Sequence, residues 1–450
     1  MAEISDHNKK TTKKMTDKYK KWFALLSKLG ITELNPMQEE AILTIQKNNE
    51  VILLSPTGTG KTIAFLLPIL DKIKPELLEV QTLILTPTRE LAIQIEQVIR
   101  KLGSGIKVNA IYGGRSGQKD QLDLKQAPAL LVGTPGRIAD HFRRGTFDTS
   151  YIKTIILDEF DKSLEIGFEN EMREIMDALE GVSKKILTSA SNRVSIPDFV
   201  NLKNPHQIMF SDQGTAQLEL KMVISPEKDK LQSLLKSLLH IGNQPGIIFC
   251  NFKDTIEYIS EFLTQNNISH GCFYGGMEQY DRELALIKFR NGTHQLLVAT
   301  DLAARGIDIP ELKFILHYQL PLKEHEFMHR NGRTARMNSE GTAYILKWQE
   351  EYLPLYLDHI KPISLNPSQK VDLSPWETLC VMGGRRDKIS KGDIAGLFFK
   401  QGGLTKEELG VIEVQQDRCY VAVHHSKVKH CLETLHNKKL KEAKIRISWV

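Results

Sequence analysis

The spacing of apolar positions changes along the chain and divides the sequence into three regions. Short apolar runs alternate with segments of helical spacing over residues 51–189 and again over 246–346. Strands that alternate with helices predict parallel sheets covered by helices on both faces, which is the α/β class. Because the second region repeats the layout of the first, we interpret the pair as a diverged duplication. The expected strands are 51–54, 82–86, 129–133, 154–157 and 185–189 in the first region and 246–250, 270–274, 296–299, 314–318 and 342–346 in the second.

The C-terminal region has a different pattern. The expected strands are 378–382, 411–414, 419–423 and 444–449, and the expected helices are 394–399 and 428–435. The order β-α-β-β-α-β is typical of a ferredoxin-like or RNA-recognition fold, a small α+β domain.

Stretches without an apolar period separate these regions and predict the domain boundaries. Residues 361–375 hold three prolines and no helical or strand period, which is typical of a linker. The predicted parts are a basic flexible tail at 1–21, a first domain at 22–206, a linker at 207–224, a second domain at 225–360, a linker at 361–375 and a third domain at 376–450.

Composition narrows the class of protein. No apolar run is long enough to span a membrane, and the N-terminus lacks the apolar core of a signal peptide. The five cysteines show no C-x-x-C spacing, so we expect neither disulfides nor a zinc site, and we expect a cytoplasmic protein. We expect no membrane partner and favour a monomer.

Charge is distributed unevenly along the chain. Residues 376–450 contain 14 Lys and Arg against 9 Asp and Glu, whereas the first 375 residues contain 46 of each kind. An excess of positive charge in one domain indicates binding to a polyanion such as RNA, although a solvated basic surface would have the same composition.

A glycine-bearing turn follows the first apolar run and has the composition of a phosphate-binding loop. It consists of Ser55, Pro56, Thr57, Gly58, Thr59, Gly60, Lys61 and Thr62. Between a strand and a helix, the N–H groups of such a turn converge on polyphosphate oxygens. Lys61 adds positive charge for the outer phosphates, and the hydroxyl of Thr62 is a suitable ligand for Mg²⁺. The sequence therefore predicts a nucleotide site.

Two acidic residues supply the chemistry that ATP hydrolysis needs. Asp158 and Glu159 follow an apolar run at 155–157. Asp158 would hold Mg²⁺, and Glu159 would position and deprotonate the attacking water. An Asp-Glu pair is also common in solvated turns, so its weight depends on the phosphate loop upstream.

A basic stretch in the second region could complete such a site. Residues 329–336 include Arg330, Arg333 and Arg336. Positive charge placed at the γ-phosphate stabilises the transition state. If these arginines face the phosphate loop across a cleft, ATP joins two domains and hydrolysis is coupled to their closure. An exposed basic helix start is the alternative.

The ordered set of motifs resembles the DEAD-box family of ATP-dependent RNA helicases in superfamily two. The resemblance covers roughly residues 22–360 and implies two tandem RecA-like domains. The matching segments are 55–62, 87–92, 113–114, 134–137, 158–161, 189–191, 279–282, 299–308 and 329–336.

This resemblance implies roles for individual residues. Gln38 is similar to the residue that reads adenine, Asp308 to one that contacts the ribose region, and Arg333 and Arg336 to the arginine fingers. The residues implied to couple ATP and RNA are Ser189, Ser191 and His329. The residues implied to touch the RNA backbone are Arg89, Gly114, Thr134, Arg137, Arg282 and Thr300.

The chain departs from the family pattern at several positions. Phe160 stands where the family has Ala, so we expect the neighbouring packing to differ. Ser191 replaces Thr, and Ala335 replaces Gly. Residues 34–35 are Leu-Asn where the family favours Pro-Thr or Pro-Ser, which bears on adenine recognition.

The C-terminal domain is similar to that of DEAD-box helicases that recognise a hairpin of large-subunit ribosomal RNA. The matching residues are 383–389 and 392–394. Residues 378–382 have no aromatic side chain for base stacking and 419–423 have only Tyr420, so we expect binding through basic edges and loops. The candidate RNA contacts are Arg385, Arg386, Lys388 and Lys391.

The leading hypothesis is an RNA-stimulated ATPase that opens short duplexes locally and remodels structured RNA, plausibly ribosomal RNA during ribosome assembly, with ATP and Mg²⁺ as cofactors. An RNA-binding clamp with a decayed ATPase is a second hypothesis, motivated by Phe160 and Ser191. A DNA translocase of the same superfamily is a third. Residues 251–254, Asn-Phe-Lys-Asp, do not fit the guanine-reading order, which disfavours a GTPase.

Overall fold

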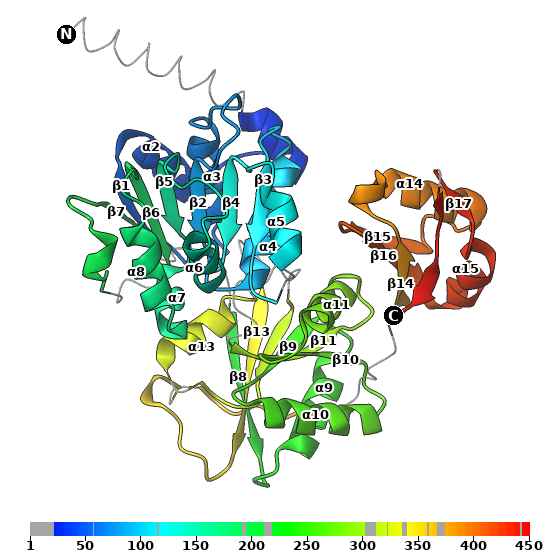
Figure 1. Ribbon diagram of the computed structural model, residues 1–450. Coiled ribbons are helices and arrows are strands. Elements are labelled where there is room, and N and C mark those ends of the chain that lie inside the picture. Colours follow the sequence, from blue (N-terminus) through cyan, green and yellow to red (C-terminus); the bar gives the residue numbers. More distant parts are fainter. Residues whose placement is uncertain are drawn as a thin grey trace, which may run out of the picture. The chain divides into compact units, whose positions relative to one another are not determined.

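The computed structural model describes residues 22–56, 58–114, 117–190, 195–210, 218–301, 312–321, 323–334, 340–357, 360–366, 374–441 and 443–450. These residues form two parallel sheets flanked by helices and one smaller antiparallel sheet, as Figure 1 shows. The predicted fold class, two α/β domains followed by a small α+β domain, is therefore confirmed. No helix in the described ranges is both long and apolar enough to cross a bilayer.

The first sheet has seven strands in the order β3-β4-β2-β5-β6-β1-β7, and all neighbouring strands are parallel. The strands are β1 (Glu50–Leu54), β2 (Thr82–Leu85), β3 (Val108–Ile111), β4 (Leu130–Gly133), β5 (Thr154–Leu157), β6 (Lys184–Ser189) and β7 (His206–Met209). The helices are α2 (Pro36–Lys47), α3 (Lys61–Leu70), α4 (Arg89–Leu102), α5 (Gly117–Leu124), α6 (Pro135–Arg143), α7 (Phe160–Ile166) and α8 (Glu169–Asp177).

Each face of this sheet has its own apolar core. Successive residues of β1 alternate between them, since Val51 and Leu53 belong to one cluster and Ile52 and Leu54 to the other. Helices α2, α3 and α4 cover the first face, and α6 and α8 cover the second. Strands buried on both faces read as continuous apolar runs, which explains why the sequence pattern located them.

The second sheet repeats this arrangement. Its strands are β8 (Leu218–Ser225), β9 (Gly246–Cys250), β10 (His270–Phe273), β11 (Leu296–Thr300), β12 (Phe314–His317) and β13 (Gly341–Trp348). Its helices are α9 (Leu231–Ile241), α10 (Lys253–Gln265), α11 (Gln279–Arg290) and α13 (Glu324–Asn331). Its strand order is β10-β11-β9-β12-β13-β8, and that of the first sheet without β7 is β3-β4-β2-β5-β6-β1. When the strands of each sheet are numbered from one in chain order, both orders read 3-4-2-5-6-1. The shared order supports the interpretation as a duplication.

The C-terminal sheet has the order β15-β16-β14-β19 and is antiparallel. Its elements are β14 (Trp376–Met382), α14 (Lys391–Gly396), β15 (Leu409–Val414), β16 (Arg418–His424), α15 (Val428–Leu435) and β19 (Ile447–Trp449), with a small hairpin of β17 (Lys439–Leu440) and β18 (Ala443–Lys444). The predicted succession β-α-β-β-α-β is confirmed. The predicted helix at 394–399 is instead α14 followed by a wider π-helical turn at Leu397–Gln401.

Three features differ from the sequence prediction. Strands β3 and β7 were not expected, because β3 is short and contains Asn109 and β7 is mostly exposed at an edge of the sheet. The segment 207–224, interpreted as a linker, contains most of β7 and β8. The segment 361–375 begins as packed chain, since Ile363 and Leu365 contact the core of the second sheet. The tail at 1–21 lies outside the described residues, and the exact domain boundaries stay a prediction.

Gly133 at the end of β4 tests the close approach of α6 to the first sheet. A Cβ atom at this position would lie 2.6 Å from the carbonyl oxygen of Ile111 and 2.6 Å from Cγ1 of Ile138. We expect Gly133→Ala to lower the free energy of unfolding by about 1–3 kcal/mol, because backbone must move to relieve the overlap. Urea denaturation measures this change.

The matched control is Gly136→Ala, in the first turn of α6, where the added Cβ would meet only Phe168 at 3.8 Å. Its free energy of unfolding should stay within about 0.5 kcal/mol of the wild type. Equal effects of the two substitutions would contradict the packing argument.

Candidate active site and nucleic-acid interface

The predicted phosphate loop begins where β1 ends and is closed by its own hydrogen bonds. The N–H of Ser55 donates to the carbonyl oxygen of Ser189 at 3.0 Å, which ties the loop to β6. The Ser55 hydroxyl donates to Oγ1 of Thr59 at 2.9 Å, and that hydroxyl donates to the carbonyl oxygen of Pro56 at 2.9 Å. Ser55, which replaces the first glycine of the general loop pattern, therefore stabilises the turn. Thr57 lies outside the described residues.

Two glycines and a lysine shape the second half of the loop. Gly58 and Gly60 both have φ +83°, a left-handed conformation that residues with a Cβ rarely adopt. Lys61 opens α3 and is 8% exposed, and its ammonium donates to the carbonyl oxygens of Ser55 and Pro56. The ammonium thus points into the loop, and Thr62 follows it in the first turn of the helix.

Gln38 lies beside this loop, as predicted. Its backbone N–H and side-chain oxygen form a capping box with Asn35, at 2.9 and 3.0 Å. Its Nε2 donates to the carbonyl oxygen of Gly60 at 3.3 Å. Asn35, which departs from the family pattern, also contacts the loop, since its Nδ2 donates to the carbonyl oxygen of Thr59 at 3.0 Å. Asn is a good helix N-cap, so Asn35 can cap α2 where the family uses Ser or Thr. Adenine recognition by Gln38 stays a prediction.

Asp158 and Glu159 lie at the C-terminal end of β5, next to β6. The Asp158 carboxylate accepts a hydrogen bond from the Thr188 hydroxyl. Burial and the nearby charge of Glu159 raise the pKa of Asp158 to about 6, while Thr188 and Lys61 favour its charged form. Strand β1, which leads into the phosphate loop, and β5, which leads into the acidic pair, both pair with β6, so the loop and the pair lie at the same edge of the sheet. Thr188 was missed in the sequence, where it reads as an ordinary strand residue.

Glu159 has a strained backbone. Its φ of +48° is left-handed, although it is not glycine, and its N–H donates to the Thr188 hydroxyl at 3.2 Å. Such conformations persist where the surrounding structure holds them, and they gather at functional sites. The strained turn ends at α7, of which Glu159 is the N-cap residue.

The unusual Phe160 is buried in the core that α6 and α8 form with the sheet. Its ring therefore belongs to an apolar cluster and fills space there. Asp161 is also buried, and burial raises its pKa, while Ser189 at the end of β6 opposes this rise. The predicted role of Ser189 in coupling ATP to RNA stays a prediction. Ser191 lies outside the described residues.

Three of the predicted RNA contacts come together on the first sheet. The guanidinium of Arg89 lies over the turn at 113–114, since a Cβ added to Gly114 would be 2.5 Å from Nη1 of Arg89. Thr134, the N-cap of α6, is joined through its backbone N–H to the carbonyl oxygen of Ile111 at 3.2 Å. Arg89, Gly114 and Thr134 all follow the C-terminal ends of strands, where ligands of α/β sheets bind.

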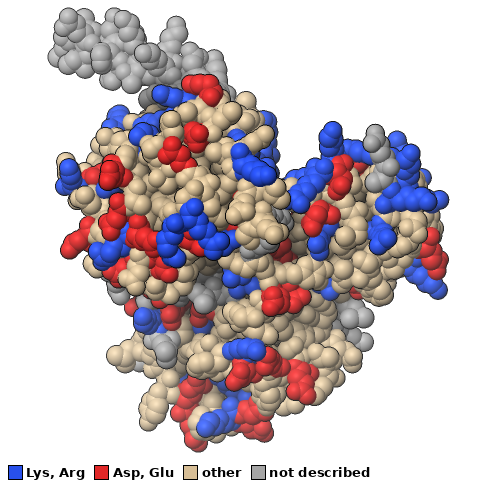
Figure 2. Space-filling view, in the orientation of Figure 1, with Lys and Arg blue, Asp and Glu red and all other residues tan. Residues whose placement is uncertain are grey.

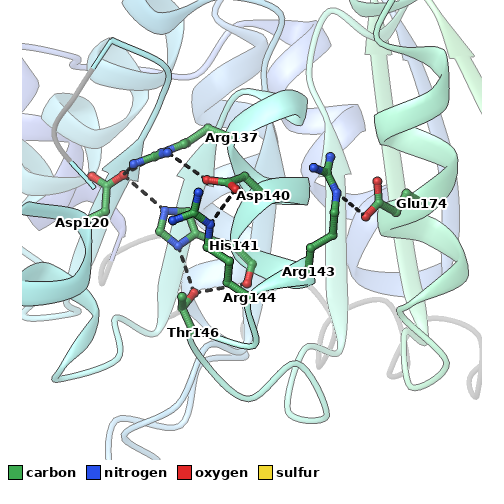
Figure 3. A network of polar contacts seen from close by, with 8 residues as sticks. All are labelled: Asp120, Arg137, Asp140, His141, Arg143, Arg144, Thr146 and Glu174. Carbon is green, nitrogen blue, oxygen red and sulfur yellow. Dashed lines mark hydrogen bonds and ion pairs between the residues drawn. The ribbon is translucent and has the colours of Figure 1, made fainter. Parts of the chain in front are cut away.

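Arg137 is held in a network of polar contacts, drawn in Figure 3. Its guanidinium contacts Asp120 at 2.8 Å and Asp140 at 2.9 Å. The Asp120 side chain is fully buried, and Nε2 of His141 lies 3.2 Å from the same carboxylate oxygen. Nδ1 of His141 lies 2.9 Å from the hydroxyl of Thr146. Asp120 was not identified from the sequence, because a single acidic residue on a short helix gives no signal.

Arg330, the first arginine of the 329–336 stretch, is buried and paired within its own domain. Arg330 is 1% exposed and donates to Asn251 at 2.8 Å and to the backbone oxygen of Gln319 at 2.6 Å. It also forms a two-point ion pair with Asp301 at the end of β11. Burial and the Arg330 charge lower the pKa of His317 to about 3, so this neighbouring ring is neutral. Arg330 thus joins α13 to the residues that follow β9, β11 and β12 within the second domain.

The remaining predicted residues of the second domain are less completely placed. Arg333 is largely buried after α13, and His329 lies on α13. Thr300 ends β11, and the guanidinium of Arg282 on α11 lies 4.8 Å from the centre of the Phe273 ring. Asp308 and Arg336 lie outside the described residues.

The four candidate contacts of the C-terminal domain gather at one turn. Arg385, Arg386, Lys388 and Lys391 are all exposed and lie between β14 and the first residue of α14. Figure 2 shows Lys and Arg side chains gathered over the outer surface of this domain. The turn is held by backbone hydrogen bonds from residues 385 and 386 to 415 and 416, both at 2.9 Å. Positive side chains on a fixed turn can contact phosphates.

Comparison with known families agrees with this arrangement. Residues 35–198 match the DEAD/DEAH box helicase family, residues 229–338 match the helicase conserved C-terminal domain, and residues 378–448 match the DbpA RNA binding domain.

Comparison with individual proteins covers nearly the whole chain. The ATP-dependent RNA helicase DbpA of Bacillus subtilis is 31% identical, with 94% of this chain and 96% of that protein aligned. DbpA of Escherichia coli is also 31% identical, over 94% of this chain and 95% of that protein. Among solved structures, Dbp5 of S. cerevisiae bound to RNA and ADP BeF3 matches with a TM-score of 0.63 and 27% identity, over 73% of this chain and 88% of that one.

Asp120 tests whether the buried network positions Arg137. We expect Asp120→Asn to lower the free energy of unfolding by about 1–3 kcal/mol, because a buried pair loses its negative charge. If Arg137 touches RNA, the RNA dissociation constant should also rise several-fold while the KM for ATP is unchanged. Fluorescence anisotropy with labelled RNA and steady-state ATPase kinetics measure these two quantities.

Asp140→Asn is the matched control, since Asp140 contacts the same guanidinium but its side chain is 23% exposed. Its free energy of unfolding should change by less than about 1 kcal/mol. A larger loss for Asp140→Asn than for Asp120→Asn would contradict the assignment of Asp120 as the anchor.

Proposed function

Because the chain belongs to the DEAD-box family of ATP-dependent RNA helicases, we propose that RNA-stimulated ATP hydrolysis drives local, non-processive remodelling of structured RNA, with ribosomal RNA as the target. The observation that carries the hydrolytic part is the contact of β5 with β6. There the Thr188 hydroxyl binds Asp158 and receives the N–H of Glu159, beside Lys61 of the phosphate loop.

The residues of the first domain fit the binding of ATP with Mg²⁺. Thr62 offers a hydroxyl, and Asp158 offers a carboxylate near Lys61, which is the hard oxygen donor set that Mg²⁺ prefers. When bound, Mg²⁺ supplies positive charge to the phosphate oxygens. Lys61 must release the carbonyl oxygens of Ser55 and Pro56 to reach a phosphate, so binding requires the loop to open.

Glu159 is proposed to act as the general base. It stands at the end of a strand with its backbone held by Thr188, so its carboxylate can orient a water molecule and accept its proton. Arg333 and Arg336 are proposed to stabilise the charge that develops on the transferred phosphoryl group.

RNA recognition is proposed to use two kinds of contact. Arg89, Gly114, Thr134 and Arg137 follow strand ends of the first sheet and would bind phosphates and sugars, which carry no sequence information. Arg282 and Thr300 would do so in the second domain. Such contacts explain binding to many RNAs by the two parallel-sheet domains.

Target preference is proposed to come from the C-terminal domain. Support comes from its match to the DbpA RNA binding domain and from the exposed basic turn at 385–391. We also propose that the protein works in the cytoplasm as a monomer, where its five free cysteines would stay reduced.

A clamp without ATPase activity is the second candidate function, and it rested on Phe160 and Ser191. The burial of Phe160 in the apolar core weakens this candidate. The ring packs among core side chains and does not take the place of Asp158 or Glu159.

Glu159→Gln tests the enzymatic part directly. The amide keeps the size of the side chain but cannot accept a proton, so we expect the RNA-stimulated ATPase rate to fall by about 10²–10⁴-fold. Phosphate release in the presence and absence of RNA measures the rate. Glu174→Gln, which removes an exposed ion pair with Arg143, is the control and should retain wild-type turnover. Unchanged turnover in Glu159→Gln would refute hydrolysis at this site and favour the clamp.

A double substitution of Arg385→Ala and Arg386→Ala tests the source of target preference. We expect the affinity for large-subunit ribosomal RNA to fall about tenfold or more through lost phosphate contacts, with ATPase activity on unstructured RNA unchanged. Competition with random RNA of equal length measures the preference. The control removes two other exposed basic residues of the same domain, by Lys429→Ala and Lys438→Ala. An equal loss in both double variants would show a general charge effect and contradict a specific turn.

A further inference from the structure

The C-terminal sheet has two faces with different roles. Alternate residues of β14 and β16, such as Leu379, Val381 and Val421, point into the core of this domain. The residues between them, Cys380 and Tyr420, form a separate cluster on the other face, where they are paired in register. In an RNA-recognition fold this second face is the one on which bases stack.

Helix α11 of the second domain covers that second face. Ile287 of α11 is fully buried and contacts Cys380 and Tyr420, with Leu284 and Val450 packed around them. Tyr420 is the one aromatic residue in 378–382 and 419–423, and it is only 2% exposed. Its ring is therefore covered by a helix of the same chain, and a base cannot stack on it while this contact holds.

An ion pair lies at the border of this apolar contact. Both Nη2 and Nε of Arg290, the last residue of α11, donate to the Glu413 carboxylate of β15, with distances of 2.9 Å from Nη2 to each oxygen and 3.2 Å from Nε. A two-point contact between a guanidinium and a carboxylate fixes direction as well as distance. The guanidinium of Arg418 in turn lies 5.3 Å from the centre of the Tyr280 ring in the first turn of α11.

Buried hydroxyl and amide groups connect the same two domains. The Thr293 hydroxyl lies 2.7 Å from the Thr378 hydroxyl, and Asn291 Nδ2 donates to that hydroxyl at 3.3 Å. Thr378 is fully buried, although it lies on the face of β14 opposite to the core. Ser374, just before β14, donates to the carbonyl oxygen of Gly292. Buried polar groups that satisfy one another in this way select one arrangement of the two surfaces.

The helix that makes these contacts also carries proposed RNA contacts. Gln279 and Arg282, in its first half, match the family segment that touches the RNA backbone. Ile287 and Arg290, in its second half, bind the C-terminal domain. The two halves are joined by a continuous helix, so a domain attached to the second half keeps a fixed distance from the first.

We propose that α11 is the docking site of the C-terminal domain, which uses its sheet face to attach to the second helicase domain and so presents its own RNA at a fixed position relative to Arg282. This proposal rests on the proposed function for its consequence, since a fixed position matters only if both parts bind RNA. The docking itself depends only on the contacts between α11 and the sheet.

Charge reversal at Arg290 and Glu413 tests the docking in the full-length protein. Spin labels at Glu261→Cys on α10 and Lys429→Cys on α15, with Cys272→Ser to remove the partly exposed thiol, report the distance between the two domains by double electron–electron resonance. We expect a narrow distance distribution in the labelled parent, broad ones in Arg290→Glu and Glu413→Arg, and a narrow one again in the double reversal.

The double reversal contains both of the single changes, so general misfolding caused by either change would persist in it. Recovery of a narrow distance distribution in the double reversal therefore indicates a direct contact between Arg290 and Glu413. A broad distribution in the labelled parent would overturn the proposal. So would narrow distributions in both single variants, or a double reversal that stays broad.

Activity measurements on the same variants test the consequence for RNA. For ATPase stimulation by large-subunit ribosomal RNA, we expect KM to rise about tenfold in each single variant and to recover in the double reversal, because a free domain presents its RNA at a lower effective concentration. Turnover at saturating unstructured RNA should stay within about twofold. If the distance distributions become broad while the KM for ribosomal RNA is unchanged, the proposal that docking presents the RNA at a fixed position is wrong. If the wild type shows no preference for ribosomal RNA, the proposed target fails while the distance measurement still decides the docking.

Discussion

The parallel register of β1, β5 and β6 is the constraint on which the ATP site depends. Leu157 pairs with Leu187, and Leu54 pairs with Ser189, so the residues that follow these strand ends meet at one edge. Thr188 lies at this junction and binds both Asp158 and the backbone of Glu159. A shift of one residue in either pairing would turn these side chains to the opposite face of the sheet. The chemistry thus depends on the hydrogen bonds of the sheet as much as on the motif residues.

Much of this architecture could be predicted from the sequence, because buried parallel strands read as continuous apolar runs and the phosphate loop has a distinctive composition. The helix predicted at 428–435 has the same bounds in the structure, and the order of the C-terminal elements was correct. Strand β7 could not be found, since an exposed edge strand needs no apolar face. Asp120 and Thr188 were missed because their importance depends on partners that are distant in sequence.

The arginines show why a motif alone does not assign a role. Arg330 and Arg333 stand three residues apart in one stretch, and Arg330 is enclosed by Asp301, Asn251 and a backbone oxygen of its own domain. A buried guanidinium needs such partners, because an uncompensated charge in the interior is costly. Its contacts fix the helix from which the stretch continues. Arg137 is similarly tied to Asp120 and Asp140, although part of it stays accessible. Charge pairing thus stiffens the elements that carry the proposed RNA contacts and arginine fingers.

The outer edge of the second sheet has a consequence for how the chain behaves in solution. Strand β8 ends the sheet order, and an unpaired strand edge can add strands from other molecules. Here the segment after the second domain covers part of it: Pro362 forms a bridge with Met222, and the N–H of Ile363 donates to the oxygen of Met222 at 2.8 Å. Lys221 and Glu219, which form an ion pair on the same strand, add charged side chains, which are unfavourable for intermolecular pairing. The segment 361–375, which was predicted to be a linker, therefore protects the second domain against aggregation. A fragment that ends before Pro362 leaves the edge of β8 open to pairing with a strand of another molecule.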